Sequence, residues 1–209
     1  MLVKTFGAAV QGIHATTITI EVNVSQGIRF MLVGLPDNAI KESHERIVSA
    51  IQFCGMKFPH QQVVINMAPA DIRKEGAAYD LPLAIGILAA SGAVLNEELS
   101  DYIIMGELSL DGTLHPIKGI LPIAIKAREE GFKGLIIPKE NAKEAAVVNN
   151  LDVYGANCLL EVINFFNKKG SIEKTIIDTR KEFFEQLNNF EMDFSDNVNV
   201  IVGNNNEGK

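Results

Sequence analysis

The sequence predicts an α/β fold, an α+β sandwich in which helices pack on a mixed sheet. Residues 4–33 are rich in strand signals, and the remainder of the first 167 residues alternates short apolar runs with helical patterns. The composition, with 47% hydrophobic and 22% charged residues, is typical of a folded globular protein. A chain of 209 residues can therefore form one domain with a well-filled core, followed by a tail.

The first third of the chain predicts strands and one capped helix. Residues 4–24 alternate apolar and polar side chains, which indicates a strand or a hairpin with one buried face. A Gln-Gly turn leads into a second strand at residues 28–33. Asp37 can cap the helix that follows, in which apolar residues recur at helical spacing up to Gly55. Residues 63–67 predict a third strand.

A helix at residues 81–91 is expected at the centre of the core. It is almost wholly apolar, so it should be buried on most sides. Gly86 would allow this helix to approach the sheet closely, and Gly92 would end it.

The second half of the chain continues the alternation. Strands are expected at residues 102–106, 108–110, 113–117, 135–137 and 153–154. Helices are expected at residues 121–130, 142–148 and 159–167. The Asp111–Gly112 pair is a strong signal for a tight turn between two of the strands.

The character of the sequence changes near residue 168. Residues 171–190 can form an amphipathic helical linker, and the tail that begins at Asp193 is rich in Asn and acidic residues. We therefore assign residues 1–168 to one domain and residues 169–209 to a linker.

Charge and composition exclude several classes of protein. A net charge of −7 argues against binding of a nucleic-acid backbone by this chain unaided. No apolar run reaches the roughly 18 residues of a membrane span, and the N-terminus lacks the pattern of a signal peptide, so a cytoplasmic chain is expected. Cys54 and Cys158 are expected to be reduced, and the four dispersed histidines predict no metal site.

The run NMAPADIRKEGAAYDLPLAIGILAASG, from Asn66 to Gly92, is the most informative segment. It resembles the active-site stretch of Lon-type peptidases, in which a serine and a lysine form the catalytic dyad. The resemblance places Ala78 at the position of the serine and Ile123 at that of the lysine. A methyl group cannot attack a carbonyl, so the resemblance implies the peptidase scaffold without its chemistry. Lys118 and Lys126 lie near the lysine position but do not align with it.

Three blocks resemble the N-terminal, magnesium-chelatase ChlI-like domain of the ComM/YifB family of AAA+ ATPases. They are GLPDNAIKESHERI, the run from Asn66 to Gly92, and GELSLDGTLHPIKGILP. The chain has Ala77 and Tyr79 where the family usually carries Pro and Phe, and both changes are mild. The resemblance covers residues 1–168 and implies a Lon-like domain with the fold of ribosomal protein S5 domain 2. It also implies fusion to an ATPase ring that remodels DNA by branch migration during natural transformation.

The loop of the peptidase-like motif is charged, and two interpretations of it remain open. Its residues are Arg73, Lys74, Glu75 and Gly76, followed by Asp80. They could form a contact surface for a neighbouring subunit or for the ATPase domain. Alternatively, the loop is simply solvated, Asp80 caps the following helix, and Arg73 pairs with Asp71 on the surface.

The last seven residues match the first part of a phosphate-binding loop, with Gly203, Gly208 and Lys209 at the motif positions. The Ser or Thr that would hold Mg²⁺ is missing, and an Asn-rich tail can match such a pattern by accident. We therefore expect no enzymatic activity and no cofactor for this chain, whereas the resemblance implies ATP and Mg²⁺ for the full-length family.

The expected partners are the chain's own AAA+ domain and neighbouring subunits of a homo-oligomeric ring, which the resemblance implies is a hexamer, with DNA bound only through the full-length protein. A Lon-like peptidase or another hydrolase with an unrecognised nucleophile is the alternative function. A chelatase subunit, suggested by the family's name alone, ranks last.

Overall fold

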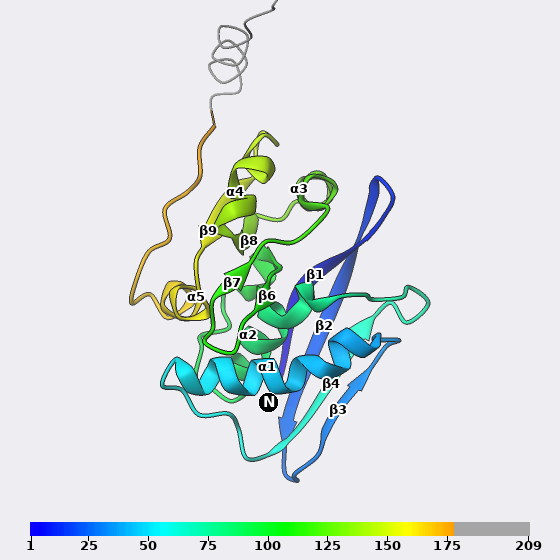
Figure 1. Cartoon of the computed structure of the whole chain (residues 1–209), viewed down its shortest axis with the longest axis vertical. Coiled ribbons are helices and arrows are strands. Elements are labelled where there is room, and N and C mark those ends of the chain that lie inside the picture. The colour runs from blue at the N-terminus through cyan, green and yellow to red at the C-terminus, as the bar shows by residue number, and fades with distance from the viewer. Residues whose placement is uncertain (178–209) are drawn as a thin grey trace, which may run out of the picture. The chain divides into compact units, whose positions relative to one another are not determined.

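The computed structural model describes residues 1–177, and these form a mixed seven-stranded sheet with five α-helices (Figure 1). The strand order is β3-β4-β2-β1-β5-β8-β9. The strands of this sheet are β1 (Leu2–Gln11), β2 (His14–Ser25), β3 (Phe30–Val33), β4 (Gln62–Ala68), β5 (Tyr102–Ile104), β8 (Gly134–Pro138) and β9 (Asp152–Ala156). Pairing is antiparallel between β1, β2 and β4 and parallel elsewhere, so the predicted α/β class is confirmed.

The remaining elements pack around this sheet. A small second sheet pairs β6 (Glu107–Leu108) with β7 (Leu114–His115). The helices are α1 (Asn38–Phe53), α2 (Asp80–Ala90), α3 (Ile120–Glu129), α4 (Lys139–Ala146) and α5 (Leu159–Phe166), with short 3-10 turns at η1 (Ala77–Tyr79) and η2 (Leu99–Asp101). No helix within residues 1–177 combines the length and apolar character that a membrane crossing requires.

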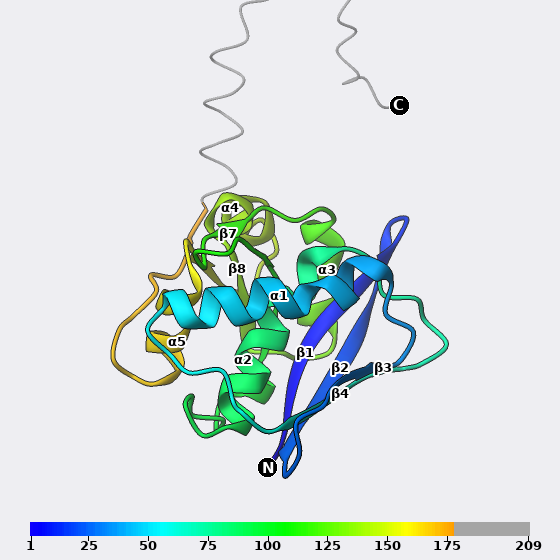
Figure 2. The same ribbon diagram turned by 60° about the horizontal axis from the view of Figure 1, so that its bottom comes forward.

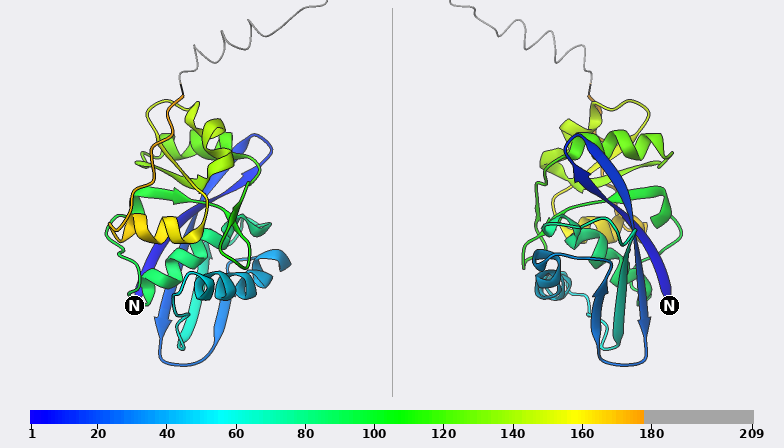
Figure 3. Two further views of the ribbon diagram at one scale, coloured as in Figure 1. Left: turned by 60° about the vertical axis from the view of Figure 1, so that its left-hand side comes forward. Right: turned by 90° about the vertical axis from the view of Figure 1, so that its right-hand side faces the viewer.

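The predicted N-terminal hairpin is formed by β1 and β2, which pair from Leu2↔Asn23 to Gln11↔His14. Its two faces meet different helices because side chains alternate along a strand. Thr5 donates a hydrogen bond to a carbonyl of α2, whereas Thr17, on the opposite face, donates to Glu130 just after α3. Figure 3 shows the tip of the hairpin extending alongside α3.

The capped helix is also confirmed. Oδ1 of Asp37 accepts a hydrogen bond from the backbone N–H of Ile40 at 2.9 Å, which satisfies one of the free amides at the start of α1. Helix α1 lies across α2 on the same side of the sheet (Figure 2).

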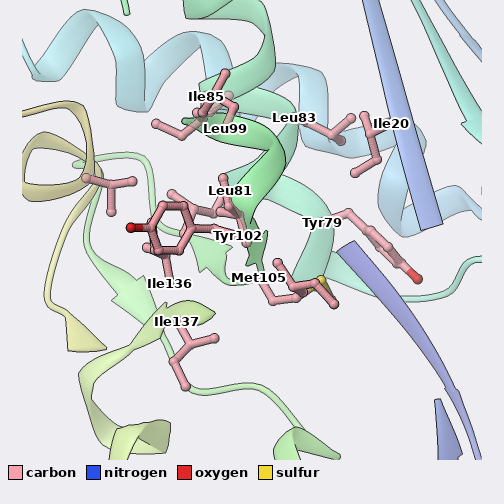
Figure 4. Close-up of a cluster of buried hydrophobic side chains, with 14 of the residues drawn as sticks. Ile20, Tyr79, Leu81, Leu83, Ile85, Leu99, Tyr102, Met105, Ile136 and Ile137 are labelled. Atoms are coloured by element: carbon pink, nitrogen blue, oxygen red, sulfur yellow. The ribbon is translucent and has the colours of Figure 1, made fainter. Parts of the chain in front are cut away.

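Helix α2 forms the centre of the core, as predicted, and all eleven of its residues are buried. Its side chains pack with those of the sheet and of the neighbouring loops, including Ile20, Tyr102 and Met105 (Figure 4). A Cβ added to Gly86 would lie 2.7 Å from Cγ2 of Val22 on β2, so the glycine permits this close approach.

Several elements in the second half have bounds that differ from the predicted ones. The expected strand at residues 113–117 pairs with β6 only at Leu114 and His115, and it does not extend to Ile117 because the backbone N–H and C=O of Ile117 bind the side chain of Asn141. The helix expected at residues 142–148 begins earlier, at Lys139, directly after β8.

The helical linker predicted to begin at residue 171 is wrong for residues 171–177. These residues are extended, and the N–H of Thr175 donates to the carbonyl of Val153 on β9 at 2.8 Å. Pairing with an available strand edge satisfies backbone groups there, so the apolar spacing does not produce a helix. The compact unit comprises residues 1–177, and the remainder of the predicted linker lies outside the described residues. The division at residue 168 stays a prediction.

Candidate functional site

Hydrogen bonds join the loop between β3 and α1 to the loop that follows β4. The N–H of Asp37 donates to the carbonyl of Lys74 at 3.1 Å, and Oδ2 of Asp37 accepts from the N–H of Gly76 at 2.9 Å. This contact between the two loops also requires glycine at position 34. The φ of Gly34 is 98°, and a Cβ added there would lie 2.1 Å from the carbonyl oxygen of Met67. One carboxylate therefore caps α1 and positions the loop that follows β4.

Lys74 is buried, although the sequence suggested a solvated position. Its ammonium group donates to the carbonyl of Gly34 at 2.9 Å and also to that of Pro69. Burial lowers the pKa of Lys74, while the nearby charge of Asp71 raises it. Lys74 thus ties the two loops together from within and is not available for contact with a partner.

Asp80 does not cap its own helix, which corrects the second part of the solvated-loop interpretation. Its side chain is only 1% exposed and accepts two hydrogen bonds from Arg46, from Nε at 2.7 Å and from Nη2 at 3.0 Å. The N–H of Leu108 donates to the same carboxylate. Burial raises the pKa of Asp80, an effect that Arg46 opposes, and the bond to Asp80 raises the pKa of Arg46. Because η1 continues directly into α2, Asp80 is the first residue of the helix and Tyr79 holds the capping position. The carboxylate of Asp80 therefore binds Arg46 on α1.

Arg73 and Glu75 are the two exposed charged side chains of this loop. Nε of Arg73 lies 3.0 Å from Oε1 of Glu75. The expected pair between Arg73 and Asp71 is therefore replaced by a pair between Arg73 and Glu75. Both side chains are largely in water, which makes the pair weak.

The two residues that the resemblance places at the dyad positions line one cavity of about 220 Å³. Ala78 comes from η1 and Ile123 from α3, and Lys118 also lines the cavity. The remaining lining residues are Ala8, Ala9, Val10, Gln11, Arg73, Glu75, Tyr79 and Met105. No serine, threonine or cysteine from the described part of the chain lines it, so this lining offers no hydroxyl or thiol of the kind that a serine or cysteine peptidase uses.

The contacts of two residues of this region, Arg46 and Tyr79, carry no signal in the sequence. Arg46 looks like an ordinary exposed residue of an amphipathic helix, and nothing in the sequence links it to Asp80. The hydroxyl of Tyr79 donates to the carbonyl of Ala8 at 3.0 Å, and burial raises the pKa of Tyr79. These contacts depend on the tertiary fold, so only a fold-level comparison could have suggested them.

Ser91 and Ser109, the serines nearest to the motif in the sequence, have other partners. Ser91 donates to the carbonyl of Leu88 at 2.9 Å, which is a local contact at the end of α2. Ser109 hydrogen-bonds to Nε2 of His115 across the β6–β7 turn, at an exposed position. Neither lines the cavity beside Ala78.

Two further features considered from the sequence are a metal site and a phosphate-binding loop. Within residues 1–177, no three His, Cys, Asp or Glu side chains are grouped in a way that could hold a metal ion. The partial phosphate-binding loop, with Gly203, Gly208 and Lys209, lies outside the described residues.

Comparison with known proteins agrees with the fold. Residues 20–141 match the family described as subunit ChlI of Mg-chelatase. The chain is 42% identical over 163 residues to competence protein ComM of Haemophilus influenzae, and 38% identical over 167 residues to YifB of Escherichia coli. These alignments cover 78% and 79% of this chain but 32% and 33% of the relatives, so the chain spans about a third of their length.

A more distant similarity concerns a peptidase. The chain is 31% identical over 113 residues to Lon protease 2 of Bacillus subtilis, which corresponds to 54% of this chain and 19% of that protein. The Lon-like character expected from the loop between β4 and α2 is therefore supported by a direct match.

Proposed function

The chain belongs to the magnesium-chelatase ChlI-like family and, within it, to the ComM/YifB group, and we propose that it is the non-catalytic N-terminal domain of an AAA+ ATPase that remodels DNA. The Haemophilus relative is named a competence protein, which supports a role in transformation. Branch migration as the reaction of the full-length protein is a further part of this proposal.

The observation that carries the non-catalytic part is the cavity at Ala78 and Ile123. A serine–lysine peptidase needs a hydroxyl and an amine that can meet. Here a methyl group and a buried isoleucine occupy the two corresponding positions. The proposal therefore assigns this domain a role in assembly or in guiding substrate, and assigns the energy-consuming step to the ATPase domain.

The architecture supports such a role because it is rigid in the region of the motif. Lys74 and Asp37 join two loops, and Arg46 and Asp80 join α1 to α2. A body held in this way can set the spacing between subunits of a ring. Its proposed partners are its own AAA+ domain and the neighbouring subunits, in the cytoplasm, while ATP, Mg²⁺ and DNA would bind only to the full-length protein.

The test compares the full-length ATPase with a version that lacks residues 1–168. We expect the deletion to lower the fraction of hexamer in the presence of ATP, as measured by mass photometry, and to slow branch migration of a synthetic Holliday junction. Equal hexamer fractions and equal branch-migration rates in the two proteins would overturn the proposal.

The hydrolase alternative needs a separate test, because Ser109 and His115 do lie within hydrogen-bonding distance. Their contact is exposed to solvent and Ser109 does not line the cavity beside Ala78, so we expect no reaction with a fluorophosphonate probe. Stoichiometric labelling of the folded chain that disappears in Ser109→Ala would establish the hydrolase instead.

A further inference from the structure

Strand β1 leaves part of one edge open beside the cavity. On one side it pairs with β2 along its whole length, up to Gln11. On the other side it pairs with β5 only at Phe6↔Ile103. Residues 8–11 therefore have no neighbouring strand on the side where the cavity lies.

The direction of the free backbone groups follows from the contacts of Ala8. Its N–H points to Sδ of Met105 at 3.3 Å, and its carbonyl accepts from Tyr79, so both groups point away from β2. In an antiparallel pair, every second residue directs its N–H and C=O to the same side. Val10 therefore presents a donor and an acceptor to the cavity, and nothing within residues 1–177 is hydrogen-bonded to them.

The cavity beside this edge has room for a side chain and one unpaired charge at its rim. Its volume of about 220 Å³ is below the roughly 300–1,000 Å³ of typical small-molecule sites. Lys118 is exposed and lines the cavity, and no carboxylate in the described part of the chain pairs with it. The other cation, Arg73, is already paired with Glu75.

We propose that this groove binds an extended segment of a partner protein, which pairs as a strand with the free N–H and C=O of Val10 on β1. A small apolar side chain of the segment occupies the cavity beside Ala78, and a carboxylate of the segment lies near Lys118. Main-chain hydrogen bonds to an open strand edge supply affinity, while the cavity and the charge supply specificity. A polypeptide fits this edge because it offers alternating donors and acceptors, which a nucleic-acid backbone does not.

The inference does not depend on the proposed role in ring assembly, because a single chain provides the complete groove. Binding of a peptide to this chain and assembly of the full-length ATPase are separate measurements. Either one can fail while the other succeeds.

The test uses the full 209-residue chain, labelled with ¹⁵N, and a blocked hexapeptide, acetyl-TEVAVT-amide, as the probe. We expect the amide signal of Val10 to shift during titration, and its hydrogen exchange to slow at least tenfold at saturation. A control peptide with Lys in place of Glu should bind at least fivefold more weakly.

A matched pair of variants separates edge pairing from general damage to the hairpin. Val10→Pro removes the donor that faces the cavity, whereas Ala15→Pro changes the residue opposite Val10, whose N–H faces the other side. We expect Val10→Pro to abolish binding and Ala15→Pro to retain it. Dispersed spectra of both variants establish that they are folded.

The charge is tested by reversal. Lys118→Glu should prefer the lysine peptide over the glutamate peptide by at least fivefold. Loss of binding in both proline variants, retention of binding in Val10→Pro, or an unchanged preference in Lys118→Glu would each overturn the proposal. So would a shift of Val10 caused by an oligothymidine and by neither peptide.

Discussion

At the scale of single residues, the structure places charged side chains inside the fold, where their pairing determines their effect on stability. Asp80 is almost fully buried, and Arg46 supplies both of its charged hydrogen bonds from α1. Removing one partner of such a pair leaves an uncompensated charge in a region without water, whereas removing both partners leaves none. The pair therefore matters more for which helices meet than for net stability.

Arg46→Met should lower the free energy of unfolding by about 3 kcal/mol, because the carboxylate of Asp80 would lose its counter-charge. The double variant Arg46→Met with Asp80→Leu should recover at least half of this loss, since no buried charge remains. Urea denaturation of the single and double variants measures both values. If the double variant were less stable than Arg46→Met alone, the pair would be a net source of stability and not chiefly a determinant of packing.

Lys74 should make the stability of the fold depend on pH at mildly alkaline values. Burial lowers the pKa of Lys74 from 10.5, so just below pH 10.5 the unfolded chain binds more protons than the folded one. The free energy of unfolding therefore contains a contribution that rises with pH in that window. Comparison with Lys74→Met isolates the contribution, because effects of other groups, including Cys54 and Tyr79, are common to both proteins.

The measurement is urea unfolding of the wild type and Lys74→Met at intervals between pH 8 and pH 10.5. The difference in the free energy of unfolding, wild type minus variant, should increase across this range. A difference that stays constant or decreases would show that folding does not lower the pKa of Lys74.

At the scale of the elements, the position of α2 against the sheet depends on one glycine. An alanine at position 86 would place its Cβ 2.7 Å from Cγ2 of Val22, so helix or strand must move. Overpacking of this kind costs about 1–3 kcal/mol, which exceeds the roughly 0.5–1 kcal/mol that alanine gains over glycine within a helix. Gly86→Ala should therefore destabilise the protein.

The double variant Gly86→Ala with Val22→Ala provides the control, because the smaller side chain at position 22 makes room for the new methyl group. We expect a favourable coupling of at least about 1 kcal/mol in a double-mutant cycle measured by urea unfolding. Strictly additive effects would indicate that the contact at Gly86 does not set the packing of α2.

The sequence predicted those elements whose signal is local. The capping carboxylate of Asp37, the apolar run of α2 and the alternation in the hairpin all act within a few residues of one another, and each was found. The interior of the candidate site was not predicted, because Arg46 and Lys74 acquire their partners only when segments distant in the sequence meet. A charged residue that is buried and paired has the same local sequence pattern as one that is exposed.

At the scale of the whole molecule, the last described segment completes the sheet. Lys174 and Thr175 lie along β9, the outermost strand of the order β3-β4-β2-β1-β5-β8-β9, and Lys174 forms an ion pair with Asp152. Ile172 packs against the core. An uncovered strand edge is a template for pairing with other chains, so residues 171–177 protect the sheet as well as extend it.

A chain that ends at Gly170 should therefore be less stable than one that ends at Ile177, and more prone to self-association. The longer chain keeps the hydrogen bond from Thr175 to Val153 and the packing of Ile172, which together are worth roughly 2 kcal/mol. Urea unfolding measures the difference, and sedimentation velocity detects dimers formed through the exposed edge of β9. Lys174→Ala in the longer chain is the matched control, and because that side chain is exposed we expect little change in its unfolding midpoint. Equal stability of the two chains, with both monomeric, would place the functional boundary of the domain near residue 168 and leave residues 171–177 without a structural role.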